Sequence, residues 1–157
     1  MATIHLIHGF IGFGKTTVAK KLAAELPAVR LTNDEFMEQL YGRNPPAEMF
    51  DDYYNRIDGL IWNLAEKIIK AGVDVIIDSG FWSKEFRRAN FARAKSITDN
   101  VVFHKIECDM ETAKQRVLAR TNSDNKELEI NENTFEIRRK DFEPISESEG
   151  YEIITHS

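Results

Sequence analysis

A glycine-rich loop near the N-terminus constrains this chain more than any other feature. Residues 9–16 read Gly-Phe-Ile-Gly-Phe-Gly-Lys-Thr and fit the pattern G-x-x-x-x-G-K-[ST]. The loop follows residues 3–8, which predict a strand, and it opens a predicted helix over residues 15–26 that Pro27 ends. A strand, a glycine loop and a helix in this order predict an α/β fold whose first helix directs its N-terminal N–H groups at an anion.

The rest of the chain continues this alternation of strands and helices. Further strands are predicted at residues 29–32, 73–78, 101–107 and 151–155. Further helices are predicted at residues 34–40, 48–71, 83–97, 109–120 and 134–142, with Asn33 or Asp34, Ser83 and Asp109 as N-caps. The alternation predicts a parallel sheet covered by helices on both faces. At 157 residues, the chain has room for a single domain over residues 1–157.

Composition and charge exclude several classes of protein. Hydrophobic residues make up 42% and charged residues 30%, which disfavours disordered and low-complexity architectures. The net charge of −5 disfavours an extended surface for nucleic acid or anionic membrane. The single cysteine, Cys108, indicates a reducing compartment. No export signal and no apolar run of membrane-spanning length is present, so the sequence predicts a cytoplasmic protein.

The pattern of the loop is typical of sites that bind the phosphates of ATP together with Mg²⁺. The residues expected to hold the nucleotide are Gly9, Gly12, Phe13, Gly14, Lys15, Thr16 and Thr17. We predict that Lys15 reaches the β- and γ-phosphates and that the Thr16 hydroxyl binds Mg²⁺. A glycine-rich turn with an incidental lysine is the alternative, but the complete pattern between a strand and a helix favours nucleotide binding.

Two aspartates are predicted to lie at the same edge of the sheet as the loop. Asp78 ends an apolar strand and is expected to hold Mg²⁺ through water, the alternative being a turn or cap residue. Asp34 follows the second strand and is predicted to accept the proton of an acceptor hydroxyl, with Glu35 as the rival base and helix capping as the alternative. Ser79 stands where a motor ATPase carries a glutamate, which disfavours hydrolysis as the main reaction. The sequence after Asp78 also lacks the D-x-x-G spacing of GTPases.

A pair of arginines is predicted to serve the phosphates. Arg116 and Arg120 are four residues apart, so they share one face of a helix directly before the polar segment 121–132. We expect this segment to act as a lid that closes and brings the arginines onto the phosphates. The alternative is an exposed face on which they are solvated or paired with Glu111 or Asp109.

Other basic and imidazole side chains are interpreted as structural or solvated. A solvated basic helix face is predicted from Lys84, Arg87, Arg88, Arg93 and Lys95. The histidines His5, His8 and His104 lack the spacing of metal ligands and are interpreted as structural.

Together, the loop, residues 31–36 (Leu-Thr-Asn-Asp-Glu-Phe) and residues 75–79 (Val-Ile-Ile-Asp-Ser) resemble the P-loop kinases of the AAA-domain "predicted kinase" group. This group lies near the 5′-kinase domain of polynucleotide kinase, chloramphenicol phosphotransferase and zeta toxins. The resemblance covers nearly the whole chain. It implies a three-layer P-loop NTPase fold with a five-stranded parallel sheet in the order 2-3-1-4-5, as in proteins similar to nucleoside-monophosphate kinases.

The resemblance also implies site residues. It implies Asp34 as the base, Asp78 as a partner of the acceptor or the metal, and Arg116 and Arg120 in a lid that closes over ATP. Met37 stands where polynucleotide kinases carry an arginine three residues after the base, and segment 121–132 is acidic. Both departures disfavour a nucleic-acid acceptor.

The sequence therefore predicts a phosphotransferase, a monomer or homodimer, that uses ATP and Mg²⁺ to phosphorylate a hydroxyl of a small molecule. A nucleotide-dependent switch or chaperone-like ATP-binding module is one alternative. A polynucleotide 5′-hydroxyl kinase is the other.

Overall fold

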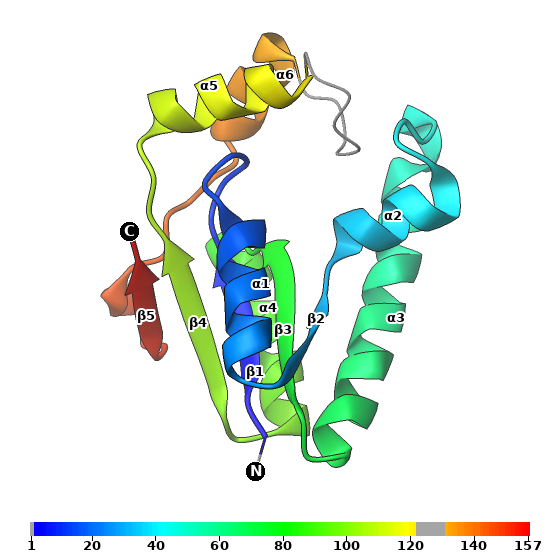
Figure 1. Ribbon diagram of the computed structural model, residues 1–157, viewed down its shortest axis with the longest axis vertical. Coiled ribbons are helices and arrows are strands. Elements are labelled where there is room, and N and C mark those ends of the chain that lie inside the picture. The colour runs from blue at the N-terminus through cyan, green and yellow to red at the C-terminus, as the bar shows by residue number, and fades with distance from the viewer. Residues whose placement is uncertain (1, 122–130) are drawn as a thin grey trace.

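A parallel sheet runs through the middle of the computed structural model, which describes residues 2–121 and 131–157 (Figure 1). Its strands are β1 (Ile4–His8), β2 (Ala28–Leu31), β3 (Asp74–Gly80), β4 (Val101–Ile106) and β5 (Ile153–His156). The helices are α1 (Lys15–Glu25), α2 (Asn33–Tyr41), α3 (Phe50–Lys70), α4 (Lys84–Ile97), α5 (Met110–Thr121) and α6 (Glu132–Arg139). Short 3₁₀ turns lie at η1 (Ala47–Met49) and η2 (Glu147–Glu149). Of the predicted lid, residues 122–130 lie outside the described part of the chain.

The strands are ordered β2-β3-β1-β4-β5, and every pairing is parallel. The predicted α/β fold and its strand order are therefore confirmed. In the register, Ile7 of β1 lies opposite Asp78 of β3. Because all carboxyl ends meet at one edge, the loop after β1 and the end of β3 become neighbours there.

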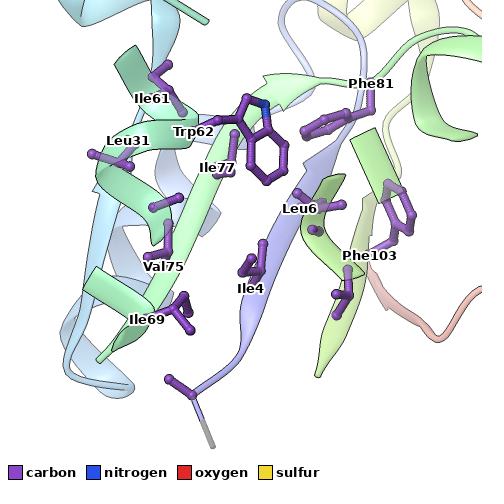
Figure 2. Packing of buried hydrophobic residues seen from close by; sticks show 14 of the residues in the cluster. Ile4, Leu6, Leu31, Ile61, Trp62, Ile69, Val75, Ile77, Phe81 and Phe103 are labelled. Atoms are coloured by element: carbon purple, nitrogen blue, oxygen red, sulfur yellow. The ribbon is translucent and has the colours of Figure 1, made fainter. Parts of the chain in front are cut away.

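Alternate residues of the central strands belong to two separate hydrophobic cores, one on each face of the sheet. Ile4 and Leu6 pack with α3 and α4 on one face of the sheet, whereas Ile7 packs with α1 on the other (Figures 1 and 2). These three side chains are 0% exposed, and burial of each contributes about 1.5–3 kcal/mol to folding. Helices α5 and α6 lie beyond the carboxyl ends of the strands. None of the described helices combines the length and apolar composition that a bilayer crossing requires.

Two of the predicted N-caps are confirmed. The Ser83 hydroxyl accepts a hydrogen bond from the backbone N–H of Phe86 at 3.0 Å and caps α4. The Asp109 carboxylate accepts one from the backbone N–H of Thr112 at 3.0 Å, in the first turn of α5. Each bond satisfies a helix N–H that has no partner within the helix.

A row of three imidazoles and one carboxylate crosses four strands on the face of the sheet that α1 covers. His5 Nε2 lies 3.0 Å from Asp74 Oδ2, and His5 Nδ1 lies 2.8 Å from His104 Nε2. His104 Nδ1 lies 2.9 Å from His156 Nε2. The carboxylate of Asp74 can only accept hydrogen bonds, so His5 must donate from Nε2. If all three rings are neutral, each histidine of the row carries its proton on Nε2, and every bond is donated in the direction from His156 towards Asp74. The row thus ties β3, β1, β4 and β5 together.

The buried histidines make stability depend on pH. Burial, with smaller contributions from His5 and His156, lowers the pKa of His104 from 6.5 to about 4, and burial also lowers the pKa of His8 to about 4. Between pH 6.5 and about pH 4, the unfolded chain therefore binds more protons than the folded chain. The free energy of unfolding falls as the pH falls through this range. We expect a loss on the order of 3 kcal/mol per ring when the pH falls from 7 to 4.

Urea unfolding at fixed pH steps measures this dependence. A His104→Asn variant removes one of the two rings whose pKa is lowered to about 4, so its stability should fall less steeply between pH 7 and pH 4 than that of the parent. Equal slopes for the two proteins would contradict the assignment.

Candidate active site

The glycine loop joins β1 to α1, and α5 packs against it. Gly12 has φ 81° and Gly14 has φ 93°, a left-handed conformation that side chains rarely adopt. A Cβ at Gly12 would lie 2.5 Å from the carbonyl oxygen of Ala113, so only glycine fits beneath α5. Helix α1 begins at Lys15, directly after the loop. Its N-terminal N–H groups therefore line the loop, as an anion site requires.

The polar side chains predicted to serve the nucleotide lie at the start of α1. Lys15 is half-buried and its Nζ donates to the carbonyl oxygen of Phe10 at 3.1 Å. Thr16 and Thr17 are exposed in the first turn of the helix. Phe13, in contrast, is buried and packs edge-on against Phe10. Its side chain belongs to the core under the loop, and its contribution to an anion site is its backbone.

Asp78 lies in β3, beside the end of β1. Its side chain is buried, and burial raises the pKa of its carboxyl group. The positive charge of Lys15 opposes this rise, whereas the negative charge of Asp34 adds to it. The positive charge of Arg30 also lowers the pKa of Asp78, and the negative charge of Glu35 raises it. The electrostatic coupling places the predicted donor lysine and both predicted aspartates in one neighbourhood.

Asp34 is exposed in the first turn of α2, and its predicted role as a helix cap is wrong. Thr32 occupies the N-cap position, so the expectation that Asn33 or Asp34 caps this helix is not met. Asn33 is buried instead, and its side-chain Nδ2 donates to the carbonyl oxygen of Tyr54 in α3 at 3.3 Å. This tertiary bond fixes the start of α2 and leaves the Asp34 carboxylate on the exposed side.

Glu35, the rival base, forms an ion pair with Arg30 of β2. The guanidinium donates to Glu35 Oε1, so this carboxylate already binds a cation that ties α2 to the sheet. Glu35 thus has a structural role at the start of α2.

The two arginines of α5 differ in exposure, Arg116 being exposed and Arg120 half-buried. The Arg116 guanidinium donates to the carbonyl oxygen of Gly12 at 3.3 Å and lies 3.7 Å from the sulfur of Cys108. Arg116 is thus brought onto the glycine loop, while Arg120 is half-buried one turn later. Within the described residues, no group of three His, Cys, Asp or Glu side chains forms a metal-ligand set.

Two residues that follow β3 make contacts that the sequence analysis did not predict. Arg87 was expected on a solvated helix face, but it is fully buried at 0% exposure, and Glu149 pairs with it. Trp82 donates its indole N–H to the carbonyl oxygen of Gly9 at 3.1 Å. The basic spacing of α4 gives no sign that one arginine turns inward, because its partner lies far along the chain.

The model of the AAA domain family matches residues 4–145 of this sequence. The chain belongs to the AAA domain family. The predicted resemblance is therefore confirmed, and the P-loop of this AAA domain implies nucleotide binding. No curated protein matches the sequence significantly.

Solved structures of other proteins share the fold of this AAA domain. Kti12 from Chaetomium thermophilum, in complex with ADP-AlF3, has a TM-score of 0.74 at 17% identity, over 98% of this chain and 88% of that chain. A sugar kinase from a Janibacter species has a TM-score of 0.68 at 17% identity, over 99% of this chain and 85% of that chain. A chain of the Pnkp1/Rnl/Hen1 RNA repair complex has a TM-score of 0.75 at 20% identity, over 92% of this chain and 48% of that chain. At these identities the likeness shows the P-loop NTPase fold alone.

Proposed function

We propose that this AAA domain transfers the γ-phosphoryl group of ATP to a hydroxyl group of a small molecule. The observation that carries the proposal is the buried Asp78 carboxyl group beside the end of β1, because the charges of Lys15 and Asp34 both act on its pKa. A lysine for the donor phosphates and an exposed aspartate for the acceptor are the parts that phosphoryl transfer needs.

Each side chain has a distinct part in the proposed reaction. Lys15 stabilises the negative charge on the transferring group, and Asp34 accepts the proton of the attacking hydroxyl. Arg116 already lies on the loop at Gly12, from where its guanidinium can contact phosphate oxygens. Arg120, one turn later on the same helix, is the second proposed phosphate contact.

A Mg²⁺ ion fits the donor set at this edge. Hydroxyl and carboxylate oxygens, here Thr16 and Asp78, are ligands that Mg²⁺ prefers, with nucleotide phosphates and water completing the shell. Burial raises the pKa of Asp78, and a divalent cation nearby would favour its charged form. When bound, the ion supplies positive charge that offsets the charge on the phosphates.

The acceptor side favours a small molecule over a nucleic acid. Met37, three residues after Asp34, is uncharged and buried at 1% exposure. This position therefore offers no cation to a 5′ phosphate or to a nucleic-acid strand. A sugar kinase is among the proteins with this fold, which supports a hydroxyl acceptor. The fold is also that of Kti12, whose structure contains ADP-AlF3, and this supports a nucleotide-dependent switch as the second candidate.

Measurement of ATP consumption against a panel of hydroxyl metabolites separates these candidates. A kinase should consume ATP rapidly only when one metabolite is present, and the product should carry the labelled γ-phosphate. A switch should instead show slow, metabolite-independent hydrolysis. Label transfer to 5′-hydroxyl oligonucleotides with a strong dependence on salt would favour the polynucleotide kinase.

Asp78→Asn should weaken the response to Mg²⁺. An amide oxygen is a poorer partner than a carboxylate for a hard cation and its waters, so the Mg²⁺ concentration for half-maximal rate should rise roughly tenfold. Titration of Mg²⁺ at saturating ATP measures the shift. Asp74→Asn, at the opposite end of β3, serves as the matched control, and an unshifted Mg²⁺ curve for Asp78→Asn would contradict the metal role.

A further inference from the structure

The turn after β3 holds the first residue of the phosphate loop from two directions. The Trp82 indole Nε1 donates to the carbonyl oxygen of Gly9 at 3.1 Å, and the Gly9 N–H donates to the carbonyl oxygen of Gly80 at 3.2 Å. The peptide unit between Gly9 and Phe10 is planar, so the bond to the Gly9 carbonyl also fixes the direction of the Phe10 N–H. The turn therefore controls the backbone at the start of the loop.

This turn has a backbone that few side chains adopt. Phe81 is buried and has φ 50°, in the left-handed region that bulky residues avoid. Gly80 has φ 77°, and a Cβ there would lie 2.6 Å from the Trp82 Nε1. Such a conformation persists only where the surrounding contacts hold it in place.

Arg87 supplies most of these contacts. Its Nη1 donates to the carbonyl oxygens of Phe81 at 2.8 Å, Trp82 at 3.0 Å and Glu143 at 2.8 Å. Its Nε and Nη2 donate to the two carboxylate oxygens of Glu149 at 2.8 Å and 3.0 Å. The rigid fork of a guanidinium can satisfy the carboxylate and the carbonyls at once, which an ammonium cannot.

His8, the last residue of β1, adds a second hold on the same turn. Its Nδ1 lies 3.0 Å from the carbonyl oxygen of Phe81, and its Nε2 accepts the backbone N–H of Ile145 at 3.1 Å. A neutral ring with its proton on Nδ1 satisfies both bonds. Burial lowers the pKa of His8 to about 4, so the ring keeps this form at neutral pH.

We infer that Trp82 and Arg87 are positioning residues of the donor site, an inference that rests on the proposed function. Arg87 holds the turn over residues 80–82, and the Trp82 indole sets the backbone of Gly9, where the phosphate loop begins. Arg87 thus acts on the nucleotide through Trp82. The turn also follows Asp78 by only two residues, so the same contacts hold the end of β3 against the loop.

Trp82→Phe tests the indole N–H, because phenylalanine keeps an aromatic ring beside Phe10 but has no donor. We expect the Kd for Mg·ATP to rise about three- to tenfold, the size expected for one neutral hydrogen bond. Calorimetric titration of the purified full chain in the absence of acceptor measures this. A residue with a merely structural role would lower the melting temperature and leave the Kd unchanged, so an unchanged Kd overturns the inference.

Trp62→Phe is the matched control. Trp62 is a buried tryptophan in the core beside α3 (Figure 2). The Arg93 guanidinium lies over its ring, 5.1 Å from the centroid. Its replacement should lower stability and leave the Kd for Mg·ATP within about twofold of the parent. Parent protein that binds no Mg·ATP would contradict the proposed function itself, whereas tight binding by both the parent and Trp82→Phe contradicts only the inference.

The Trp62→Phe protein also provides a measurement that needs no change at Trp82. The chain has two tryptophans, so Trp82 becomes its sole indole fluorophore. Mg·ATP should change its emission, because the indole is bonded to the loop that binds the phosphates. Emission that stays constant up to saturating nucleotide would overturn the inference even if Trp82→Phe failed to fold.

A double-mutant cycle tests the action of Arg87 through Trp82. Arg87→Lys keeps the charge beside Glu149 but loses the fork, so it should weaken Mg·ATP binding at least as much as Trp82→Phe. If the two residues act in series, the double variant should bind Mg·ATP no more weakly than Arg87→Lys alone. Full additivity of the two effects would overturn this route.

Discussion

Lys15→Ala should lower turnover on the order of 10³-fold and leave the fold intact. Lys15 sits at the first position of α1, half-buried at the mouth of the loop, where its ammonium is placed to stabilise charge on the transferring phosphoryl group. Its side chain belongs to neither hydrophobic core, so the melting temperature should change little. Steady-state rates together with thermal unfolding measure both quantities.

Lys20→Ala provides the matched control for this change. Lys20 is exposed on the same helix and lies outside the loop, so its removal should leave the rate within about twofold. A Lys15→Ala protein that is folded and nearly as active as the parent would end the proposal for Lys15.

Asp34→Asn should separate chemistry from nucleotide binding. The donor phosphates are held by the loop, so the Kd for ATP should stay nearly unchanged, whereas kcat should fall by roughly 10² to 10⁴ because the amide cannot accept a proton. Single-turnover rates with the acceptor and calorimetric ATP binding measure the two effects separately.

Glu35→Gln distinguishes the rival base. Glu35 is paired with Arg30, so its neutral variant should mainly weaken the contact between α2 and β2 and lower stability. Asp51→Asn, in the exposed first turn of α3, should change neither rate nor stability appreciably. If Asp34→Asn kept the full rate and Glu35→Gln lost it, the base would be Glu35.

Much of the fold follows from local sequence signals. Strand β3 contains the short apolar run at residues 75–77, and the apolar residues of α3 recur at helical spacing. Each of these elements can therefore be predicted from its own sequence. The order of the strands came from the resemblance, since periodicity alone does not say which strands pair. The error at the start of α2 has a tertiary cause, because Asn33 bonds to Tyr54 in another helix.

The candidate site also has one part that could be predicted from the sequence and one part that could not. The glycine loop has a contiguous pattern, so its residues could be named from the sequence. Arg87 and Glu149 are 62 residues apart, and the histidines of the row lie on different strands, so their meeting depends on sheet register and chain path. His5, His8 and His104 were interpreted as structural, but the row that joins His5, His104 and His156 could not be predicted from single positions.

The bonds beneath the phosphate loop have a consequence for the order of events during synthesis. Residues 9–16 leave the ribosome well before Glu143, Ile145 and Glu149, which bond to Arg87 and His8. A nascent chain that ends before residue 143 therefore carries the complete glycine motif while Arg87 lacks its carboxylate and His8 lacks its amide partner. Nucleotide binding should then reach its full strength only after residue 149 has left the ribosome, so that ATP stabilises the shorter fragments less.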